Sequence, residues 1–367
     1  MQSEKYSRDN AGQSLKKYIL LKQGELAYNH GASKAKQFGC CYELTEPEAR
    51  IPYVYHCFKI NEDEYTPYVA MALNNTKMDQ QLKRLVSSSV RMDGLLNISF
   101  EDYMSVTLHL PSFIEQKHIA DFLTKLDERI AYQERLITSL KKYKRGVIQH
   151  IFRSSHTLIK RSQWQQVRLG DIFKKVSRRN TNGKIKNVIT NSAEYGLIPQ
   201  RDFFDKDIAV DGNTSNYYVI EEGDFVYNPR KSNNAPFGPF NRYTLSEQGI
   251  ISPLYTCLVL QANINPSYLA WYFKSDAWHR YIYDNGSQGV RHDRVSMTDN
   301  LLMGIPVIYP ERKIQDSIAN TLDLIESRLH LAQNKLDLLN IERNGFMQQL
   351  FILKAAVLTL PLSQSKK

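Results

Sequence analysis

The chain has 367 residues, of which 42% are hydrophobic and 23% are charged. This composition excludes wholesale disorder, and the length predicts roughly two domains. The net charge of +10 indicates a phosphate-rich partner, with nucleic acid favoured over a membrane surface.

The remaining composition gives no sign of a targeting segment, a membrane span or a bound metal. The first residues, MQSEKYSRDN, are polar and unlike a signal peptide. The longest apolar run, FILKAAVLTLPL, contains Lys354 and is shorter than the ~20 residues of a membrane-spanning helix. The four cysteines form no Cys-x-x-Cys pair. We expect a cytoplasmic protein with no membrane partner, no metal and no cofactor.

A short Gly-x-x-x-Tyr-Asn element occurs twice along the chain. QGELAYNHG, which begins at Gln23, returns as EGDFVYNPR, which begins at Glu222, a shift of 199 positions (223 − 24 for the glycines). The same shift relates Tyr28 to Tyr227, Asn29 to Asn228, Pro111 to Pro310, Gln116 to Gln315, Leu140 to Leu339 and Phe152 to Phe351. In the middle the register slips by one, so that VRMD returns as VRHD. A register held this long predicts a tandem duplication.

The duplication is incomplete in its first copy. The second copy begins at WQQVRLGDIF, and the stretch from Trp164 to Pro199 has no counterpart ahead of the first Tyr-Asn element. A sheet that loses its first element exposes an edge and part of its core. We therefore expect the first copy to be impaired, or to be completed by another chain.

Each copy has two parts. Short Tyr-rich runs such as NYYVI and YTCLVL, separated by Gly, Pro and Asn, predict short strands with some helix. A long helical pattern follows, and Ser112 with Glu115 marks its start as a capping box. The predicted organisation is a first domain at 1–110, a long helix at 111–153, a second domain at 164–309, a second long helix at 310–353 and a tail at 354–367.

Apolar residues in both long helices recur at alternating steps of four and three, which is an a/d heptad seam. The seam residues are Ile119, Leu123, Leu126, Ile130, Ile137, Leu140, Ile318, Leu322, Ile325, Leu329, Leu336 and Leu339. One such seam in each copy predicts that the two helices pack on each other. The alternative is that each helix packs separately on its own globular part.

These features resemble the specificity subunits of type I restriction–modification systems. LPSFIEQKHIADFLTKLDERIAYQERLITSLKKYKRGVIQHIF is similar to their long helical region. WQQVRLGDIF, EGDFVYNP, IISPLYTCLVL and GVRHD are similar to parts of their target-recognition domains. The resemblance covers nearly the whole chain, and its specificity comes from the order of the motifs in two copies.

The resemblance implies an α+β fold, in which two mixed α/β target-recognition domains are separated by a pair of long antiparallel coiled-coil helices with pseudo-two-fold symmetry. It implies a non-catalytic subunit that reads a bipartite site on double-stranded DNA. Two methyltransferase subunits would dock on the helices, and restriction/translocase subunits would then join. The alternatives are a stand-alone DNA-binding coiled-coil scaffold or repressor, and a truncated, partly inactive specificity subunit.

Two short patterns would favour a catalytic function instead. Asn228-Pro-Arg is similar to the Asn-Pro-Pro-aromatic loop of amino-methyltransferases but lacks the second proline and the aromatic residue. Asp102 with Glu115-x-Lys, and Asp299 with Glu311-x-Lys, resemble a nuclease metal site. Both Glu-x-Lys runs follow a proline at a helix start, where a carboxylate ordinarily caps the helix.

Cation-rich loops next to polar amides are the candidate DNA-facing parts, because Arg pairs with guanine, Asn or Gln pairs with adenine, and Lys attracts phosphate. The candidates are Lys34, Lys36, Gln37 and Arg91 in the first copy, and Arg178, Arg179, Arg230, Lys231, Asn233, Asn234, Arg291 and His292 in the second. A solvated turn is the alternative for each loop residue, and an ion pair with a nearby aspartate is the alternative for Arg91 and Arg291.

Overall fold

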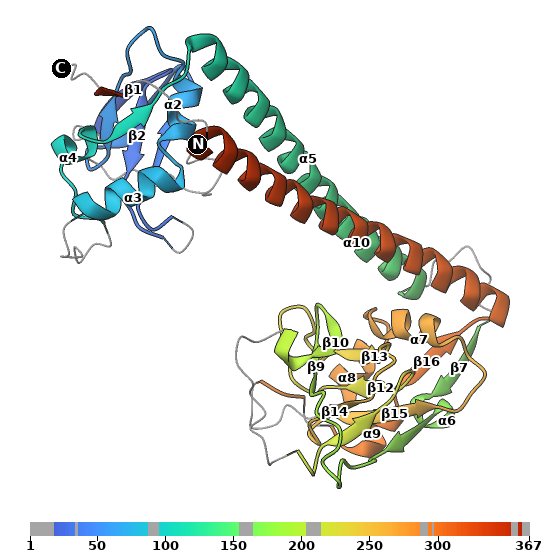
Figure 1. Ribbon diagram of the computed structural model, residues 1–367. Helices are drawn as coiled ribbons and strands as arrows, with labels where there is room; N and C mark the ends of the chain where they lie inside the picture. Colours follow the sequence, from blue (N-terminus) through green and yellow to red (C-terminus); the bar gives the residue numbers. More distant parts are fainter. Residues whose placement is uncertain are drawn as a thin grey trace. The chain divides into compact units, whose positions relative to one another are not determined.

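The computed structural model describes residues 18–33, 36–86, 95–153, 164–202, 214–286, 293–295, 297–353 and 359–361 (Figure 1). The chain forms two compact units, each with its own core. The first unit combines Met1–Arg135 with Gln333–Lys367, and the second unit is Leu136–Ala332. Each of the two long helices therefore contributes one stretch to each unit.

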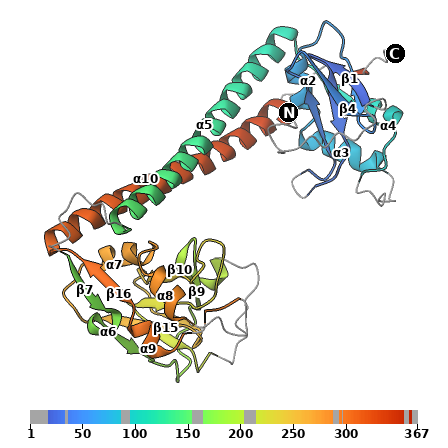
Figure 2. The same ribbon diagram turned by 180° about the vertical axis from the view of Figure 1, so that it is seen from behind.

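The first unit contains a three-stranded and a two-stranded sheet, both antiparallel, with short helices packed on them (Figure 2). Its elements are β1 (Tyr18–Lys22), β2 (Leu26–Asn29), β3 (Cys40–Glu43), β4 (Glu48–Pro52), β5 (His56–Phe58), α2 (Thr66–Ala72), α3 (Thr76–Leu85), α4 (Phe100–Met104) and β6 (Thr107–His109). Strand β2 lies between β3 and β5, and β1 pairs with β4. The rings of Tyr28 and Tyr103 stack at 3.9 Å between centroids in the core.

The second unit repeats this plan with additional strands. Its elements are β7 (Gln165–Arg168), α6 (Leu169–Ile172), β8 (Phe173–Val176), β9 (Ile189–Ser192), β10 (Gly196–Pro199), η3 (Gln200–Asp202), β11 (Tyr218–Ile220), β12 (Phe225–Tyr227), β13 (Phe240–Arg242), β14 (Gly249–Ile251), β15 (Thr256–Leu260), α7 (Pro266–Phe273), α8 (His279–Asn285), α9 (Asp299–Met303) and β16 (Pro306–Tyr309). The main sheet has the order β13-β12-β15-β8. Aromatic residues fill its core, where Phe240 stacks on Phe273 at 4.0 Å and Trp278 is buried.

The strand pairings of the two units correspond one to one over most of their length. The set β3-β2-β5 matches β13-β12-β15, and β1 with β4 matches β11 with β14. In the second unit β16 pairs with β7, which precedes it in the chain, with Val307 opposite Val167. In the first unit β6 pairs with β17 (Thr359–Pro361), which lies in the C-terminal part of the chain, with Leu108 opposite Leu360. The predicted tail thus supplies one strand of the first unit.

Two long helices complete the fold, α5 (Phe113–Phe152) and α10 (Arg312–Gln348), and α10 ends in a π-helical turn at Gln349–Leu353. They begin two residues later than the sequence predicts. The Ser112 hydroxyl donates to the Glu115 carboxylate at 2.7 Å at the start of α5. This bond uses the residues of the predicted capping box.

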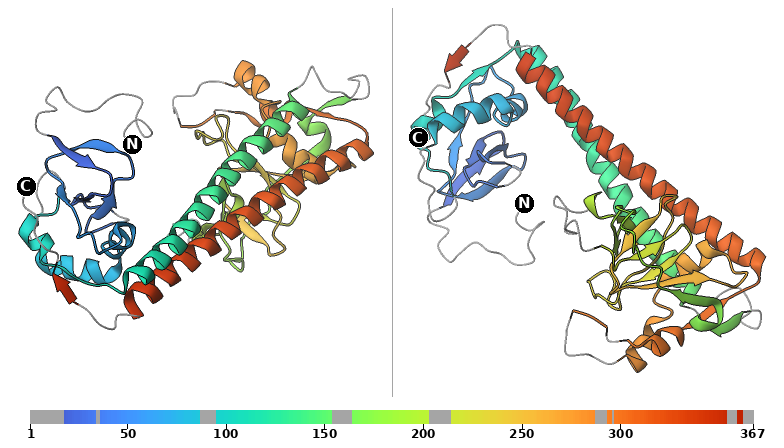
Figure 3. Two further views of the ribbon diagram at one scale, coloured as in Figure 1. Left: turned by 90° about the horizontal axis from the view of Figure 1, so that it is seen from above. Right: turned by 60° about the horizontal axis from the view of Figure 1, so that its bottom comes forward.

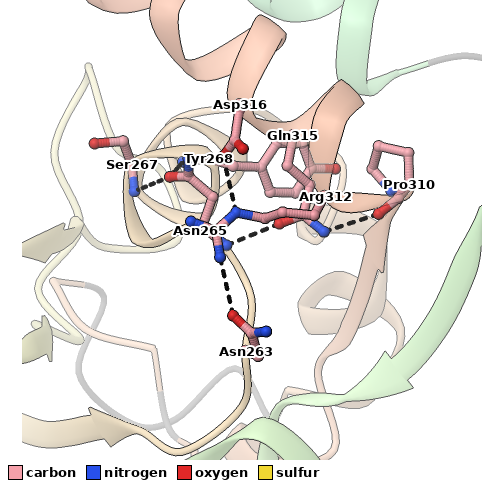
Figure 4. Close-up of polar contacts among 8 residues, drawn as sticks. All are labelled: Asn263, Asn265, Ser267, Tyr268, Pro310, Arg312, Gln315 and Asp316. Carbon is pink, nitrogen blue, oxygen red and sulfur yellow. Dashed lines mark hydrogen bonds and ion pairs between the residues drawn. The ribbon is translucent and has the colours of Figure 1, made fainter.

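A repeated glutamine joins the start of each long helix to its globular part. In the second unit the Gln315 side chain accepts from the backbone N–H of Asn265 and donates to the carbonyl of Pro310, both at 2.8 Å (Figure 4). In the first unit Gln116 makes the same two bonds, accepting from Tyr65 N at 3.0 Å and donating to Pro111 O at 2.9 Å. Both glutamines are buried, so these bonds satisfy side-chain groups that would otherwise lack partners.

The two helices lie side by side and antiparallel in each unit (Figure 3). In the first unit Asp127 of α5 forms an ion pair with Arg343 of α10, and the Phe122 ring meets Phe346 at 4.9 Å. In the second unit Lys144 of α5 and Glu326 of α10 form an ion pair at 2.6 Å. The two ion pairs occupy repeat-related positions with the helices exchanged. The predicted α+β fold with a pair of long antiparallel helices is confirmed, and separate packing of each helix is excluded.

The far end of each helix packs into the core of a globular part. Phe152 at the end of α5 meets the Tyr268 ring at 5.5 Å in the second unit. Phe351, just after α10, meets the Tyr68 ring at 5.1 Å in the first unit. Along the helices every seam residue is buried or half-buried, and Leu123 and Leu322 have exposed fractions of 1% and 0%. No helix of the described residues has the length and apolar character to cross a membrane.

Candidate nucleic-acid interface

The repeated Tyr-Asn element supports a protruding loop in each unit. In the second unit the Tyr227 hydroxyl donates to the carbonyl of Phe237 at 2.8 Å, and in the first unit Tyr28 donates to Phe38 at 2.6 Å. Each bond spans ten residues and fastens the far side of the loop to the central strand. We call residues 29–38 the first loop and residues 228–237 the second loop.

The repeated asparagine and a following glycine fix the base of each loop. The Asn228 side chain accepts the N–H of Arg230 at 3.0 Å, and Asn29 accepts the N–H of Gly31 at 2.9 Å. Gly238, which follows the second loop, has φ 85°, and a Cβ there would collide with the Asn228 carbonyl oxygen. Only glycine meets both the positive φ and the close approach. Gly39 is placed in the same way against Asn29.

Equivalent pairs of backbone hydrogen bonds flank the tips of the two loops. Ser232 and Ala235 exchange two backbone hydrogen bonds of 3.0 and 3.1 Å, which leave Asn233 and Asn234 exposed at the turn between them. Ser33 and Lys36 exchange the equivalent bonds at 2.9 and 3.2 Å. The two loops therefore share these backbone hydrogen bonds but differ in sequence between them.

A neighbouring segment holds the second loop from one side. The N–H of Lys231 donates to the carbonyl of Asp293 at 2.8 Å, and the N–H of Val295 donates to Pro229 at 2.9 Å. The Asp293 carboxylate lies 3.9 Å from Nε of Arg230 and 3.8 Å from Nε of Arg294. The Arg230 side chain is 68% exposed, so this long contact leaves its guanidinium open to a ligand.

Sequence reasoning did not identify Arg294 and Tyr255 as members of this surface. Burial raises the pKa of Tyr255, while the charges of Arg230 and Arg294 oppose that rise, which places the phenol near both cations. Tyr217 is also close enough to raise the pKa of Tyr255. An aromatic ring next to two arginines is typical of nucleic-acid surfaces. Arg294 follows the repeated VRHD run directly, and this was the one signal available for it.

The two predicted arginines before β11 have different environments. Arg178 forms ion pairs with Asp224 and, at 3.3 Å, with Glu221. Burial nevertheless raises the pKa of Asp224, although Arg178 acts to lower it. Arg178 is therefore occupied by carboxylates of its own unit. Arg179 is exposed, donates to the Asn216 side chain at 3.1 Å and lies 6.0 Å over the Tyr218 ring.

The remaining predicted residues belong mainly to the first copy. Lys36 and Gln37 are exposed in the first loop, where Lys36 donates to the carbonyl of Asn74 at 3.4 Å. The predicted candidates Lys34, Arg91, Arg291 and His292 lie outside the described residues.

The carboxylates of the nuclease interpretation make helix caps and ion pairs. Asp102 accepts from the Ser99 hydroxyl at 2.7 Å at the start of α4, and Glu115 caps α5. Asp299, at the start of α9, forms an ion pair with Lys175 at 2.6 Å. Over the described ranges no group of three or more His, Cys, Asp or Glu side chains is arranged to hold a metal ion.

Comparison with solved structures identifies the fold. No protein-family model matches the chain. Among solved structures, this chain is similar to one from a structure that describes the complex assembly and conformational transition of the type I R-M system (TM-score 0.54, 16% identity, 92% of this chain and 84% of that chain). It is also similar to the type I restriction-modification S subunit from M. genitalium (TM-score 0.50, 15% identity, 93% of this chain and 86% of that chain). The chain has the S-subunit fold. The HsdS subunit from Thermoanaerobacter tengcongensis superposes less well (TM-score 0.46, 13% identity, 90% of this chain and 81% of that chain).

The repeat places the two loops at equivalent positions of the S-subunit fold, but their side chains differ. Arg230 and Asn233 of the second loop correspond to Gly31 and Lys34 of the first. The tyrosine, asparagine and glycine that shape the loop are the same in both. The S-subunit fold of this chain thus separates a constant support from a variable tip.

Proposed function

We propose that this chain is the non-catalytic specificity subunit of a type I restriction–modification complex, and that it reads a bipartite site on double-stranded DNA. One observation carries the proposal: the same Tyr-Asn-Gly support holds a loop in each unit, and the two loops present different polar and cationic side chains. Two readers of unlike half-sites require this combination of a constant support and a variable tip.

In the second unit, Arg230, Asn233 and Asn234 are exposed and have the chemistry to read base edges, since Arg pairs with guanine and Asn with adenine. Arg179 and Lys231 would neutralise phosphates on either side and set the position of the loop in the groove. In the first unit Lys36 and Gln37 occupy the corresponding loop. The repeat relation implies that each unit contacts its half-site with the same orientation relative to its own sheet.

The outward surface of the helices supports docking of methyltransferase subunits. In the second unit Leu324 and Leu331 of α10 are 56% and 67% exposed and lie seven residues apart, away from the buried seam. On α5 of the same unit Leu136 and Tyr143 are also exposed and seven apart. A second apolar stripe at heptad spacing fits a partner helix. We assign this surface to a methyltransferase subunit; the resemblance implies that a second methyltransferase subunit and restriction/translocase subunits complete the complex.

The test uses the chain assembled with methyltransferase subunits, and maps the methylated sequence in DNA. Arg230→Ala with Asn233→Ala should relax the sequence requirement in one half-site only. A variant of the two exposed polar residues of the first loop, Lys36→Ala with Gln37→Ala, should relax the other half-site only. Unchanged methylation sequences, or two variants that relax the same half-site, would refute the assignment of one loop to each half. DNA binding without any association with methyltransferase would instead favour the stand-alone repressor.

A further inference from the structure

Over the described residues, the first unit has an open sheet edge at the position that β8 covers in the second unit. In the second unit β8 pairs with β15, with Val176 opposite Cys257, and both Cys257 and Leu258 have exposed fractions of 0%. In the first unit β5 is the edge of the order β3-β2-β5 over the described residues, and its Cys57 and Phe58 are only half-buried. An unpaired edge of this kind is a docking site for a strand.

The second unit shows how the covering strand continues. After β8, the N–H of Val219 donates to the carbonyl of Arg178 at 2.6 Å, and the N–H of Asn180 donates to Tyr217 at 3.0 Å. The chain therefore leaves the sheet at residue 180 and returns beside it at residue 217. In the sequence, β9 and β10 lie between these two points, and a short turn could join the two paired segments directly.

The sequence of this covering strand recurs near the N-terminus. Lys175–Asn180 reads KVSRRN, and Lys5–Asn10 reads KYSRDN, a shift of 170 positions (175 − 5). The lysine, serine, arginine and asparagine are identical. Only residues 11–17, which include Gly12, separate this recurrence from β1 in the sequence.

The first unit also contains the acidic partner that this arginine needs. In the second unit Arg178 pairs with Asp224, whose carboxylate accepts the N–H of Glu221 at 3.0 Å. Glu25 is the counterpart of Asp224, and its carboxylate accepts the N–H of Lys22 at 2.8 Å in the same way. Glu25 lies close enough to Cys57 to contribute, after burial, to raising the pKa of that thiol to about 11. Burial and then Asp224 raise the pKa of Cys257 to about 12, which repeats this arrangement.

We propose that the β5 edge binds residues 4–8 of this chain's own N-terminal segment as an antiparallel fourth strand, with Tyr6 opposite Cys57 and Arg8 paired with Glu25. The register of β8 on β15 also places Glu4 opposite Lys59, where the second unit has Lys174 opposite Val259. This complementary charge favours the chain's own segment over an unrelated strand. The proposal concerns the first unit itself and stands independently of the proposed function.

The proposal changes the interpretation of the incomplete first copy. Strand β17 already takes the place of β7 in the first unit, and the segment at residues 4–8 takes the place of β8. The first unit then has a counterpart of β8 in its main sheet and a counterpart of β7 in the separate pair of β17 with β6. It also acquires Asp9 where the second unit has the exposed Arg179, which makes the surroundings of the first loop less basic.

Cross-linking of the full chain tests the register. Tyr6→Cys should form a disulfide with the native Cys57 under mild oxidation, identified by mass spectrometry of the linked peptides. Lys5→Cys is the matched control, because neighbouring residues of a strand point to opposite faces and its thiol should not reach Cys57. Absence of the link in Tyr6→Cys, or an equal yield from Lys5→Cys, would overturn the proposal. A link found only in covalent dimers would assign the edge to a second copy instead and would overturn it as well.

Hydrogen exchange provides a second measurement that needs no new cysteine. Arg8→Glu should increase the exchange rate of the amides of β5 several-fold, and Arg8→Glu with Glu25→Arg should restore slow exchange. If the amides of β5 exchange equally in all three proteins, residues 4–8 do not pair with this edge. Neither measurement requires DNA or a methyltransferase, so a failure here is separate from a failure of the proposed function.

Discussion

The Tyr227→Phe variant removes the hydroxyl that supports the second loop. It should destabilise that loop without changing the side chains that the loop presents to DNA. Tyr227 is 2% exposed, and its hydroxyl makes a 2.8 Å bond to the Phe237 carbonyl. Phenylalanine keeps the ring packing and removes only the bond. A buried hydrogen bond contributes about 1 kcal/mol net, and more where the remaining partner cannot reach water. Phe237 is half-buried, so its carbonyl can be partly rehydrated, and we expect a loss of about 1 kcal/mol.

This loss sets an upper limit on the effect on DNA binding. Since 1.4 kcal/mol corresponds to a factor of ten, about 1 kcal/mol lowers the ordered population of the loop about fivefold at most. DNA affinity of the assembled complex should fall by no more than that factor. Hydrogen exchange at the Gly238 amide, which donates to Ala235, should accelerate by a similar factor.

Tyr28→Phe is the matched variant, because Tyr28 makes the equivalent 2.6 Å bond to Phe38. Tyr28→Phe should weaken discrimination in the half-site read by the first loop. It should not change hydrogen exchange at the Gly238 amide in the second loop. Affinity that falls far more than fivefold while exchange stays unchanged would mean that the Tyr227 hydroxyl contacts DNA itself. That result would refute the role of the hydroxyl as a support.

Three further predictions follow from single positions. Gly238→Ala should lower the free energy of unfolding of the second unit by more than about 2 kcal/mol, because it adds a collision to backbone strain. Gly183→Ala, at φ 61° with open space around it, should cost only about 1 kcal/mol, and thermal unfolding distinguishes the two. Leu322→Asp should break the helix pair because it buries a charge at a position with 0% exposure, whereas Leu324→Asp should leave the fold intact and reduce methyltransferase retention in a pull-down. Burial lowers the pKa of His56 below its ordinary 6.5, so the folded state binds fewer protons there than the unfolded state. Stability from this residue is present above pH 6.5 and is lost as the pH falls below it, which thermal unfolding of wild type and of His56→Phe at pH 7.5 and 5.5 would reveal.

The repeat and the helix pair could be predicted from sequence because their signals are local and periodic. Leu123 and Leu322 recur in a heptad pattern whose physical cause, burial of one helical stripe, acts within a few turns. The Tyr-Asn-Gly support was visible for a similar reason. A shared backbone geometry requires the same three residues wherever it is built.

Long-range partners could not be predicted in the same way. The pairing of β17 with β6 joins segments whose residues share little similarity with β7 and β16, because short strands pair through backbone atoms. Arg178 could be identified as a cation near a loop, but its partner Asp224 lies 46 residues away. Arg294 and Tyr255 were missed because their proximity to Arg230 depends on how three separate segments meet.

The placement of Phe152 and Phe351 has a consequence for synthesis on the ribosome. The ring that completes the packing around Tyr68 is encoded nearly 300 positions further along the chain (351 − 68 = 283). The first unit therefore cannot complete its core until Phe351 has been synthesised. The second unit can pack around Phe152 as soon as its own residues have left the ribosome. Folding should accordingly run against the order of translation, with the C-terminal half maturing first and the N-terminal half last.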